Sequence, residues 1–185
     1  MITKSDLDKL NAKDPKLKYG FAKELLKIAL EKPEQLYPHL DVWTNLMTGD
    51  NSILKWTAID IIGYLSAVDS ENRVEALIPD LIKHLHGSVL ITANHAIFAL
   101  GLIAQHKSAF KEKIISELKA ISHDQFQTEE CKKIATGKVI DALKPFASEI
   151  KNNPSLMRFI EQATQSDRNS TKKKAEQLLK KIERF

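Results

Sequence analysis

The hydrophobic positions of this chain recur at a long interval, most clearly at small residues. An alanine marks the apolar stripe of five segments, at intervals of 36, 38, 39 and 40 residues: Ala22, Ala58, Ala96, Ala135 and Ala175. Apolar residues follow each alanine at three, four and seven positions, except at Lys138. These spacings share one face of an α-helix. The pattern therefore predicts five amphipathic helices, in which the small residue lets a neighbouring helix approach closely.

A second amphipathic segment follows each of the first four predicted helices. These segments share an apolar doublet and a later apolar residue: Leu36-Tyr37 with Leu40, Leu77-Ile78 with Leu81, Ile114-Ile115 with Leu118, and Leu156-Met157 with Ile160. Pro38 and Pro79 follow the first two doublets, as is tolerated in a first helical turn. In the first of these helices Trp43 shares the apolar stripe, so we expect it in the core.

Capping residues stand at the expected helix starts. Asp14-Pro15, Asp50-Asn51 and Asn153-Pro154 are typical of a capped first turn. Ser5 with Asp8 resembles a capping box for a short first helix over residues 6–12. Residues 69–72 read as a linker.

The repeating unit is thus a helical hairpin, and the ends of the chain are half units. We expect one domain over residues 1–185, with a terminal half repeat at each end to close the core. The predicted boundaries are 1–13 for the first half repeat, 14–50, 51–88, 89–127 and 128–166 for four repeats, and 167–185 for a basic capping helix.

The stretch from Asp50 to Ala104 resembles the HEAT repeat, an armadillo-type unit. The likeness rests on the aspartate cap, on Lys55 ahead of the small residue, and on the Leu-x-Pro-x-Leu element at residues 77–81. It is best over residues 14–104, and Ser116 replaces the proline farther on. The resemblance implies an all-α, right-handed α-α superhelix, or solenoid, of about four repeats. It also implies a scaffold or adaptor function.

Charge and composition favour a soluble chain and place its excess basicity at one end. Charged residues make up 28% of the chain and hydrophobic residues 43%, and one cysteine rules out an internal disulfide. The formal net charge of +4 equals the charge of residues 171–185 alone. With no signal peptide or membrane span recognised, we expect a cytoplasmic protein that does not contact a membrane.

The sequence carries no recognisable catalytic motif, and we predict no enzyme activity, cofactor or metal site. Histidines 84 and 86 lie on different helix faces, which favours a placement near a helix C-terminus over metal binding. Cys131 is expected to pack as a small side chain. One enzymatic alternative remains: some DNA glycosylases use HEAT-like repeats with a catalytic aspartate near aromatic residues, and Trp56 and Asp60 lie four residues apart.

Two groups of residues are candidates for binding a partner. Trp56 and Phe98 lie opposite the alanine stripe, near Asp60, where they form either an ordinary packing contact between repeats or an exposed patch. The second group is the lysines of the last helix: Lys172, Lys173, Lys174, Lys180 and Lys181. Their simplest interpretation is a solvated face, and the alternative is contact with an acidic partner.

The predicted function is that of a non-enzymatic protein-protein interaction scaffold, with self-association through the convex face as one possibility. The alternative is a nucleic-acid-binding solenoid. Aromatic residues do not alternate with the lysines and arginine is scarce, so a nucleic-acid interface is the weaker interpretation.

Overall fold

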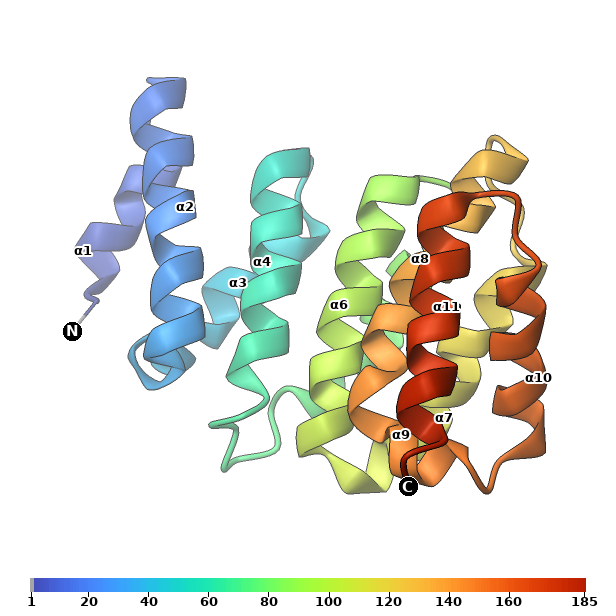
Figure 1. Ribbon diagram of the computed structural model, residues 1–185. Helices are drawn as coiled ribbons and strands as arrows, with labels where there is room; N and C mark the ends of the chain where they lie inside the picture. Colours follow the sequence, from blue (N-terminus) through green and yellow to red (C-terminus); the bar gives the residue numbers. More distant parts are fainter. Residues whose placement is uncertain (1) are drawn as a thin grey trace. The chain divides into compact units, whose positions relative to one another are not determined.

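The computed structural model describes residues 2–185, and over that range the chain is helical without a β-strand (Figure 1). The longer helices are α2 (Pro15–Glu31), α4 (Ser52–Leu65), α6 (Leu90–His106), α8 (Glu129–Leu143) and α11 (Asn169–Ile182). The others are α1 (Lys4–Leu7), α3 (Leu40–Thr48), α5 (Ile78–Leu85), α7 (Ser108–Ala120), α9 (Ala147–Ile150) and α10 (Pro154–Thr164). Each marker alanine stands in one of the five longer helices, in agreement with the predicted all-α class.

Three of the predicted helix caps are present. The side chain of Asp14 accepts a hydrogen bond from the backbone N–H of Lys16, and Asn51 accepts one from Leu54. Asn153 accepts hydrogen bonds from the first turn of α10 in the same way. These contacts satisfy N–H groups that have no partner inside the helix.

The prediction of the first capping box was wrong by two residues. Thr3, not Ser5, is the cap: its Oγ1 accepts from the N–H of Asp6 at 3.2 Å, and Asp6 Oδ2 accepts from the N–H of Thr3 at 3.0 Å. Thr3 and Asp6 have the same three-residue spacing as Ser5 and Asp8, and only Thr3 has the extended backbone that a cap needs. The first α-helix consequently ends at Leu7 and continues as a 3₁₀ turn.

The five marker alanines are all buried, with at most 2% of their surface exposed. Most of the apolar residues that follow them are buried as well, including Leu25, Ile61 and Leu178. Lys138, the exception in the sequence pattern, is exposed, and Gly137 beside it is buried. The predicted core stripe is therefore confirmed.

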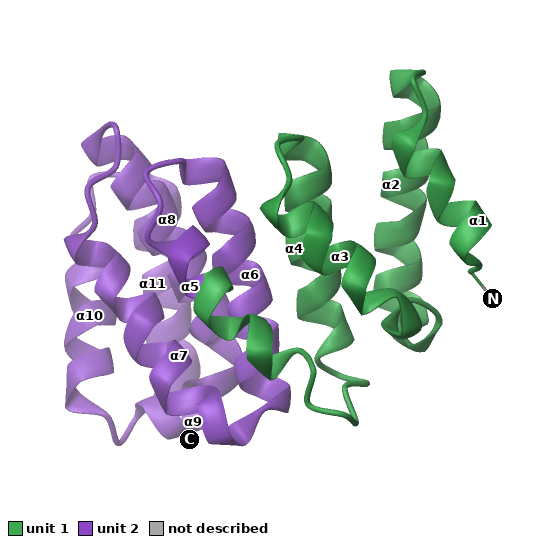
Figure 2. Cartoon of the chain, turned by 180° about the vertical axis from the view of Figure 1, so that it is seen from behind, with its two compact units in different colours: residues 1–81 green, residues 82–185 purple. Residues whose placement is uncertain are grey.

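Figure 2 shows the division of the chain into two compact units, residues 1–81 and 82–185. In the first unit α4 packs against both α2 and α3. The predicted core residue Trp43 is fully buried, and its indole N–H donates to the carbonyl of Leu36 at 3.1 Å. The linker after α4 is held by Asp69, whose carboxylate accepts from the hydroxyl of Tyr37 and from the N–H groups of Arg73 and Val74.

The second unit has two layers of helices. Helices α6, α8 and α11 form one layer, while α7 and α10 form the other (Figures 1 and 2). Within the first layer, small residues bring the helices close. A Cβ atom built on Gly101 would lie 3.0 Å from the Cβ of Ala142, and one built on Gly137 would lie 2.7 Å from Oγ1 of Thr171.

Over residues 2–185, no helix has the length and apolar character that crossing a lipid bilayer requires.

Candidate functional site

The first candidate surface lies on the first unit and is centred on α4. Trp56, Asp60 and Tyr64 follow one another at four-residue spacing, so they share one side of this helix. All three are half-buried. Burial, followed by the negative charge of Asp60, raises the pKa of the Tyr64 hydroxyl. This side of α4 thus combines aromatic surface with a carboxylate, and Tyr64 extends it by one turn. The role of Trp56 and Asp60 in binding a partner stays a prediction.

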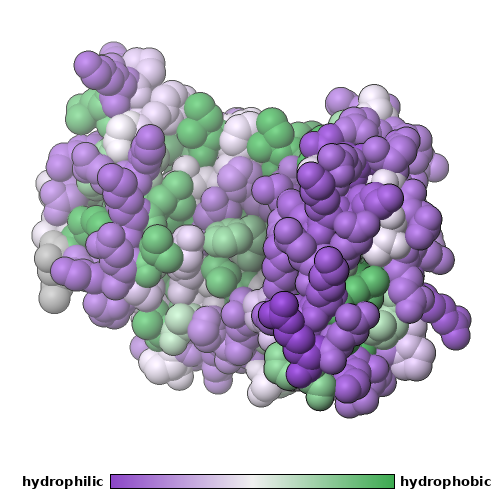
Figure 3. Space-filling model, in the orientation of Figure 1, coloured by the Kyte–Doolittle hydropathy of each residue, from purple (hydrophilic) through white to green (hydrophobic). Residues whose placement is uncertain are grey.

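Two aliphatic side chains add apolar surface to the same unit. Leu17 on α2 is 49% exposed and Ile53 on α4 is 43% exposed. Each lies five residues before the marker alanine of its helix, and α2 packs directly against α4. In Figure 3 the face formed by these helices shows apolar surface among polar side chains. This pair was not predicted from the sequence, although its common position, five residues before each marker alanine, was visible there.

The second unit has exposed apolar residues at the corresponding positions of α6. Ile91 again lies five residues before a marker alanine and is 48% exposed, and Phe98 is also exposed. Phe98 therefore lies outside the core, as the helix geometry predicted. Trp56 and Phe98 belong to different units, so the joint patch expected from them stays a prediction.

The basic residues of α11 fall into two classes. Lys172, Lys173 and Lys180 are exposed, and Figure 3 shows a hydrophilic outer surface on this helix. Lys174 instead forms an ion pair with Asp141 at 2.6 Å, and Lys181 donates to the carbonyl of Lys144 at 2.8 Å. Of the five lysines predicted to bind a partner, Lys174 thus attaches α11 to α8, and Lys181, although exposed, attaches it to the turn after α8.

Asp141 is held by two cations. Lys144, in addition to Lys174, lies 2.6 Å from its carboxylate. Burial tends to raise the pKa of Asp141, but the hydrogen bonds from Lys144 and Lys174 outweigh burial and lower it. The carboxylate is therefore ionised near neutral pH and joins the last two long helices electrostatically.

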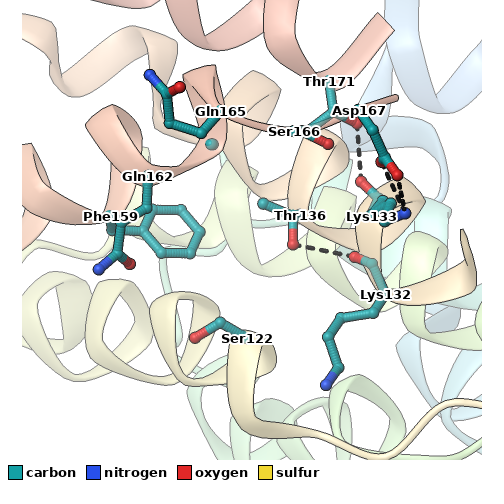
Figure 4. A pocket seen from close by; sticks show the side chains of 11 residues that line it. Ser122, Lys132, Lys133, Thr136, Phe159, Gln162, Gln165, Ser166, Asp167 and Thr171 are labelled. Carbon is teal, nitrogen blue, oxygen red and sulfur yellow. Dashed lines mark hydrogen bonds and ion pairs between the residues drawn. The ribbon is translucent and has the colours of Figure 1, made fainter. Parts of the chain in front are cut away.

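The second candidate site is a cleft of about 440 Å³ in the second unit (Figure 4). It lies where α8, α10 and the start of α11 meet the turn at Ser122, and we call it the α8–α10 cleft. Its lining consists of Ser122, Lys132, Lys133, Thr136, Phe159, Gln162, Ala163, Gln165, Ser166, Asp167 and Thr171. Phe159 and Ala163 are buried and form an apolar floor, and the surrounding side chains are polar.

A third feature is a pair of contacts at His86 that was not predicted from the sequence. Its Nδ1 lies 2.7 Å from Asp124 Oδ2, and its Nε2 lies 3.0 Å from Glu117 Oε2. Both ring nitrogens face carboxylates, an arrangement that suits the protonated imidazolium. We call these three residues the His86 clamp. The expected helix C-terminal placement does not account for it, because the contacts are made to side chains of α7 and of the following loop.

Within residues 2–185, no group of three or more His, Cys, Asp or Glu side chains has an arrangement that could hold a metal ion. Cys131, in the first turn of α8, is half-buried, and its Sγ accepts from the Thr128 hydroxyl at 3.2 Å, in keeping with a small side chain that is partly packed.

Comparison of the chain with protein-family models gives no match, and comparison with curated proteins gives no significant match.

Proposed function

We propose that this chain is a HEAT-like helical-repeat scaffold that binds another protein through its long helices. The observation that carries the proposal is the exposed apolar surface on these helices, placed at one register: Leu17, Ile53 and Ile91. Leu17 and Ile53 lie on helices that pack against each other, and apolar side chains gathered on one surface mark sites of protein interaction.

Contacts in the second unit support the repeat part of the proposal. Several side-chain contacts join residues about one repeat apart: His86 with Asp124, Lys111 with Glu149, Lys119 with Ser155, Glu130 with Arg168, Thr171 with Lys133, and Lys181 with Lys144. Their separations of 36–38 residues match the 36–40 residue intervals of the marker alanines. Stacked repeats would produce this spacing because each repeat contacts its neighbour.

The charge distribution favours a protein partner over nucleic acid. Lysines of the second unit are paired with carboxylates at Glu149, Asp167 and Asp141, which reduces the positive charge available to phosphates. Exposed lysines remain on α11, at positions 172, 173, 180 and 181. A nucleic-acid interface depends on many neutralised phosphates and a continuous basic surface.

A matched pair of variants tests the proposal. The double variant Leu17→Ser with Ile53→Ser removes apolar surface at the shared register. Leu30→Ser is the control, because Leu30 is more exposed, at 62%, and lies near the other end of α2. Quantitative affinity purification from the native host should show partners that the control retains and the double variant loses, with equal thermal stability in all three proteins.

Substitution of the aromatic residues extends the test to the predicted patch. Trp56→Ala with Phe98→Ala should reduce partner capture or self-association by about thirtyfold in affinity, the effect of losing an anchor worth about 2 kcal/mol. Partners captured equally by every variant would contradict a role for these helix surfaces. If instead the captured species is nucleic acid, and its binding needs low salt and the exposed lysines at 172, 173 and 180, the nucleic-acid alternative is favoured.

A further inference from the structure

Four hydroxyl side chains lie in the polar lining of the α8–α10 cleft, and all of them except Ser166 donate to a backbone carbonyl. Ser122 donates to the carbonyl of Lys119 at 3.1 Å, and Thr136 donates to that of Lys132 at 2.9 Å. Thr171 donates to the carbonyl of Lys133 at 2.8 Å. A hydroxyl has one hydrogen to donate and two lone pairs. With their hydrogens used in the chain's own backbone, the oxygens of Ser122 and Thr136 can only accept a hydrogen bond from a molecule in the cleft, whereas Thr171 is buried against Gly137.

The two lysines of the cleft differ in their partners. Lys133 lies 2.7 Å from Asp167, and the hydrogen bond between them raises the pKa of the lysine and lowers that of the carboxyl. Lys132 has a looser contact, 3.7 Å from Glu129, whose side chain is 79% exposed. Both partner carboxylates are exposed, at 75% for Asp167 and 79% for Glu129, so the two lysines differ in contact distance. Because its ion pair is the longer one, the ammonium of Lys132 can more readily turn to an anion in the cleft.

These features together describe one kind of occupant. It must supply N–H donors to hydroxyl oxygens, an anion to Lys132, and an apolar group to the floor at Phe159 and Ala163. Gln162, at the rim, can donate or accept. A peptide with an acidic residue beside an apolar one meets every requirement. A phosphate group could pair with Lys132, but it offers only acceptors to the hydroxyl oxygens of Ser122 and Thr136 and no apolar group to the floor.

We propose that the α8–α10 cleft binds a short acidic segment of a protein partner, with its carboxylate on Lys132 and an apolar side chain over Phe159. Figure 4 shows the side chains that would contact it: Lys132 and Thr136 come from α8, Phe159 and Gln162 from α10, and Ser122 from the facing turn. The inference rests on the proposed scaffold function and names a recognition element for it.

The test is a titration of the full ¹⁵N-labelled chain with two capped peptides, acetyl-Leu-Glu-Ala-amide and acetyl-Leu-Gln-Ala-amide. The acidic peptide should shift backbone amides at residues 122, 132–136 and 162–167, and should bind at least about tenfold more tightly than its neutral counterpart. Inorganic phosphate should leave these amides in place.

Lys132→Gln should abolish the difference between the two peptides. Lys172→Gln is the matched control, an exposed lysine outside the cleft lining, and should preserve the difference. Gln162→Ala, at an exposed position, should weaken both peptides by the same factor because it removes an uncharged contact. Amide spectra of each variant without peptide establish that the fold is retained.

Three results would overturn the proposal: equal binding of the two peptides, shifts confined to other surfaces, or phosphate acting as strongly as the acidic peptide. The scaffold function is tested elsewhere, at Leu17 and Ile53. If partner capture is lost in that double variant but is unchanged in Lys132→Gln, the scaffold stands and the cleft has no part in it.

Discussion

Gly137 on α8 and Thr171 on α11 meet so closely that the glycine position leaves no room for a methyl group. A Cβ at residue 137 would lie 2.7 Å from the threonine Oγ1, which itself donates to the carbonyl of Lys133 at 2.8 Å. The absent side chain and the hydroxyl thus belong to one contact, through which the last long helix joins the one before it.

Gly137→Ala should destabilise the protein for this reason. The added methyl must displace the Thr171 hydroxyl and lengthen its hydrogen bond, a form of overpacking that costs about 1–3 kcal/mol. Gly20→Ala on α2 is the control, because a Cβ there meets no atom within 4 Å and alanine favours an exposed helix by about 0.5–1 kcal/mol. Urea denaturation followed by circular dichroism measures both free energies of unfolding.

A double-variant cycle identifies the clashing atom. In a Thr171→Ala background, the cost of Gly137→Ala should shrink, because the oxygen that crowds the methyl is gone. Additive costs would show that the backbone, rather than the hydroxyl, sets the distance between α8 and α11.

Overpacking is also expected at the buried marker alanines. Ala58 has no exposed surface, so Ala58→Leu forces extra methyl groups into the closely packed core of α4 and should cost about 1–3 kcal/mol. Ala67→Leu, an exposed site just past the end of that helix, should change stability by less than about 0.5 kcal/mol. Equal melting temperatures for the two variants would mean that the space around Ala58 can expand.

The periodicity of the sequence predicted the core well, because the buried face of each long helix recurs at the interval of the marker alanines. The five alanines, Trp43 and the caps at Asp14, Asn51 and Asn153 followed from local spacing alone. The first cap was shifted because two overlapping segments satisfy the same pattern, and backbone geometry decides between them.

The α8–α10 cleft could not be predicted, because its lining comes from four separate segments whose meeting depends on how the helices pack. The His86 clamp is an intermediate case. His86 and Asp124 lie 38 residues apart, as do Lys111 and Glu149. Opposite charges one repeat apart were visible in the sequence once the period was known, and they offer a usable signal for contacts between repeats.

Deletion of residues 171–185 should lower stability and promote association. The segment carries Ala175, Leu178 and Ile182, all buried, and its loss exposes the surfaces of α8 and α10 that these side chains cover. The substitution of Lys172, Lys173 and Lys180 by glutamine leaves the apolar contacts intact and should change the unfolding free energy by less than about 0.5 kcal/mol. Sedimentation velocity measures the association state of the truncated and the substituted chains, and thermal melts measure their stability. A truncated chain that stays monomeric and equally stable would identify the segment as an independent arm.

The His86 clamp predicts a stability that depends on pH. Burial tends to lower the pKa of His86, but the hydrogen bonds that the ring donates to Asp124 and then to Glu117 outweigh burial and raise the pKa above 6.5. A group with a raised pKa in the folded state stabilises the fold fully below its unfolded pKa, about 6.5, and this contribution is lost as the pH rises through the folded pKa.

His86→Gln should therefore cost most stability in mildly acidic solution. We expect the gap in unfolding free energy between the native protein and the variant to be largest near pH 5.5–6 and to narrow toward pH 8.5. The reason is that a neutral imidazole donates through one nitrogen, so one of the two carboxylates loses its hydrogen bond and the pair is left facing each other without a cation.

His123→Gln, at an exposed histidine in the neighbouring turn, controls for the general titration of histidines. Urea denaturation of the three proteins across this pH range gives the comparison, and a gap that stays constant with pH would mean that His86 remains in one protonation state throughout.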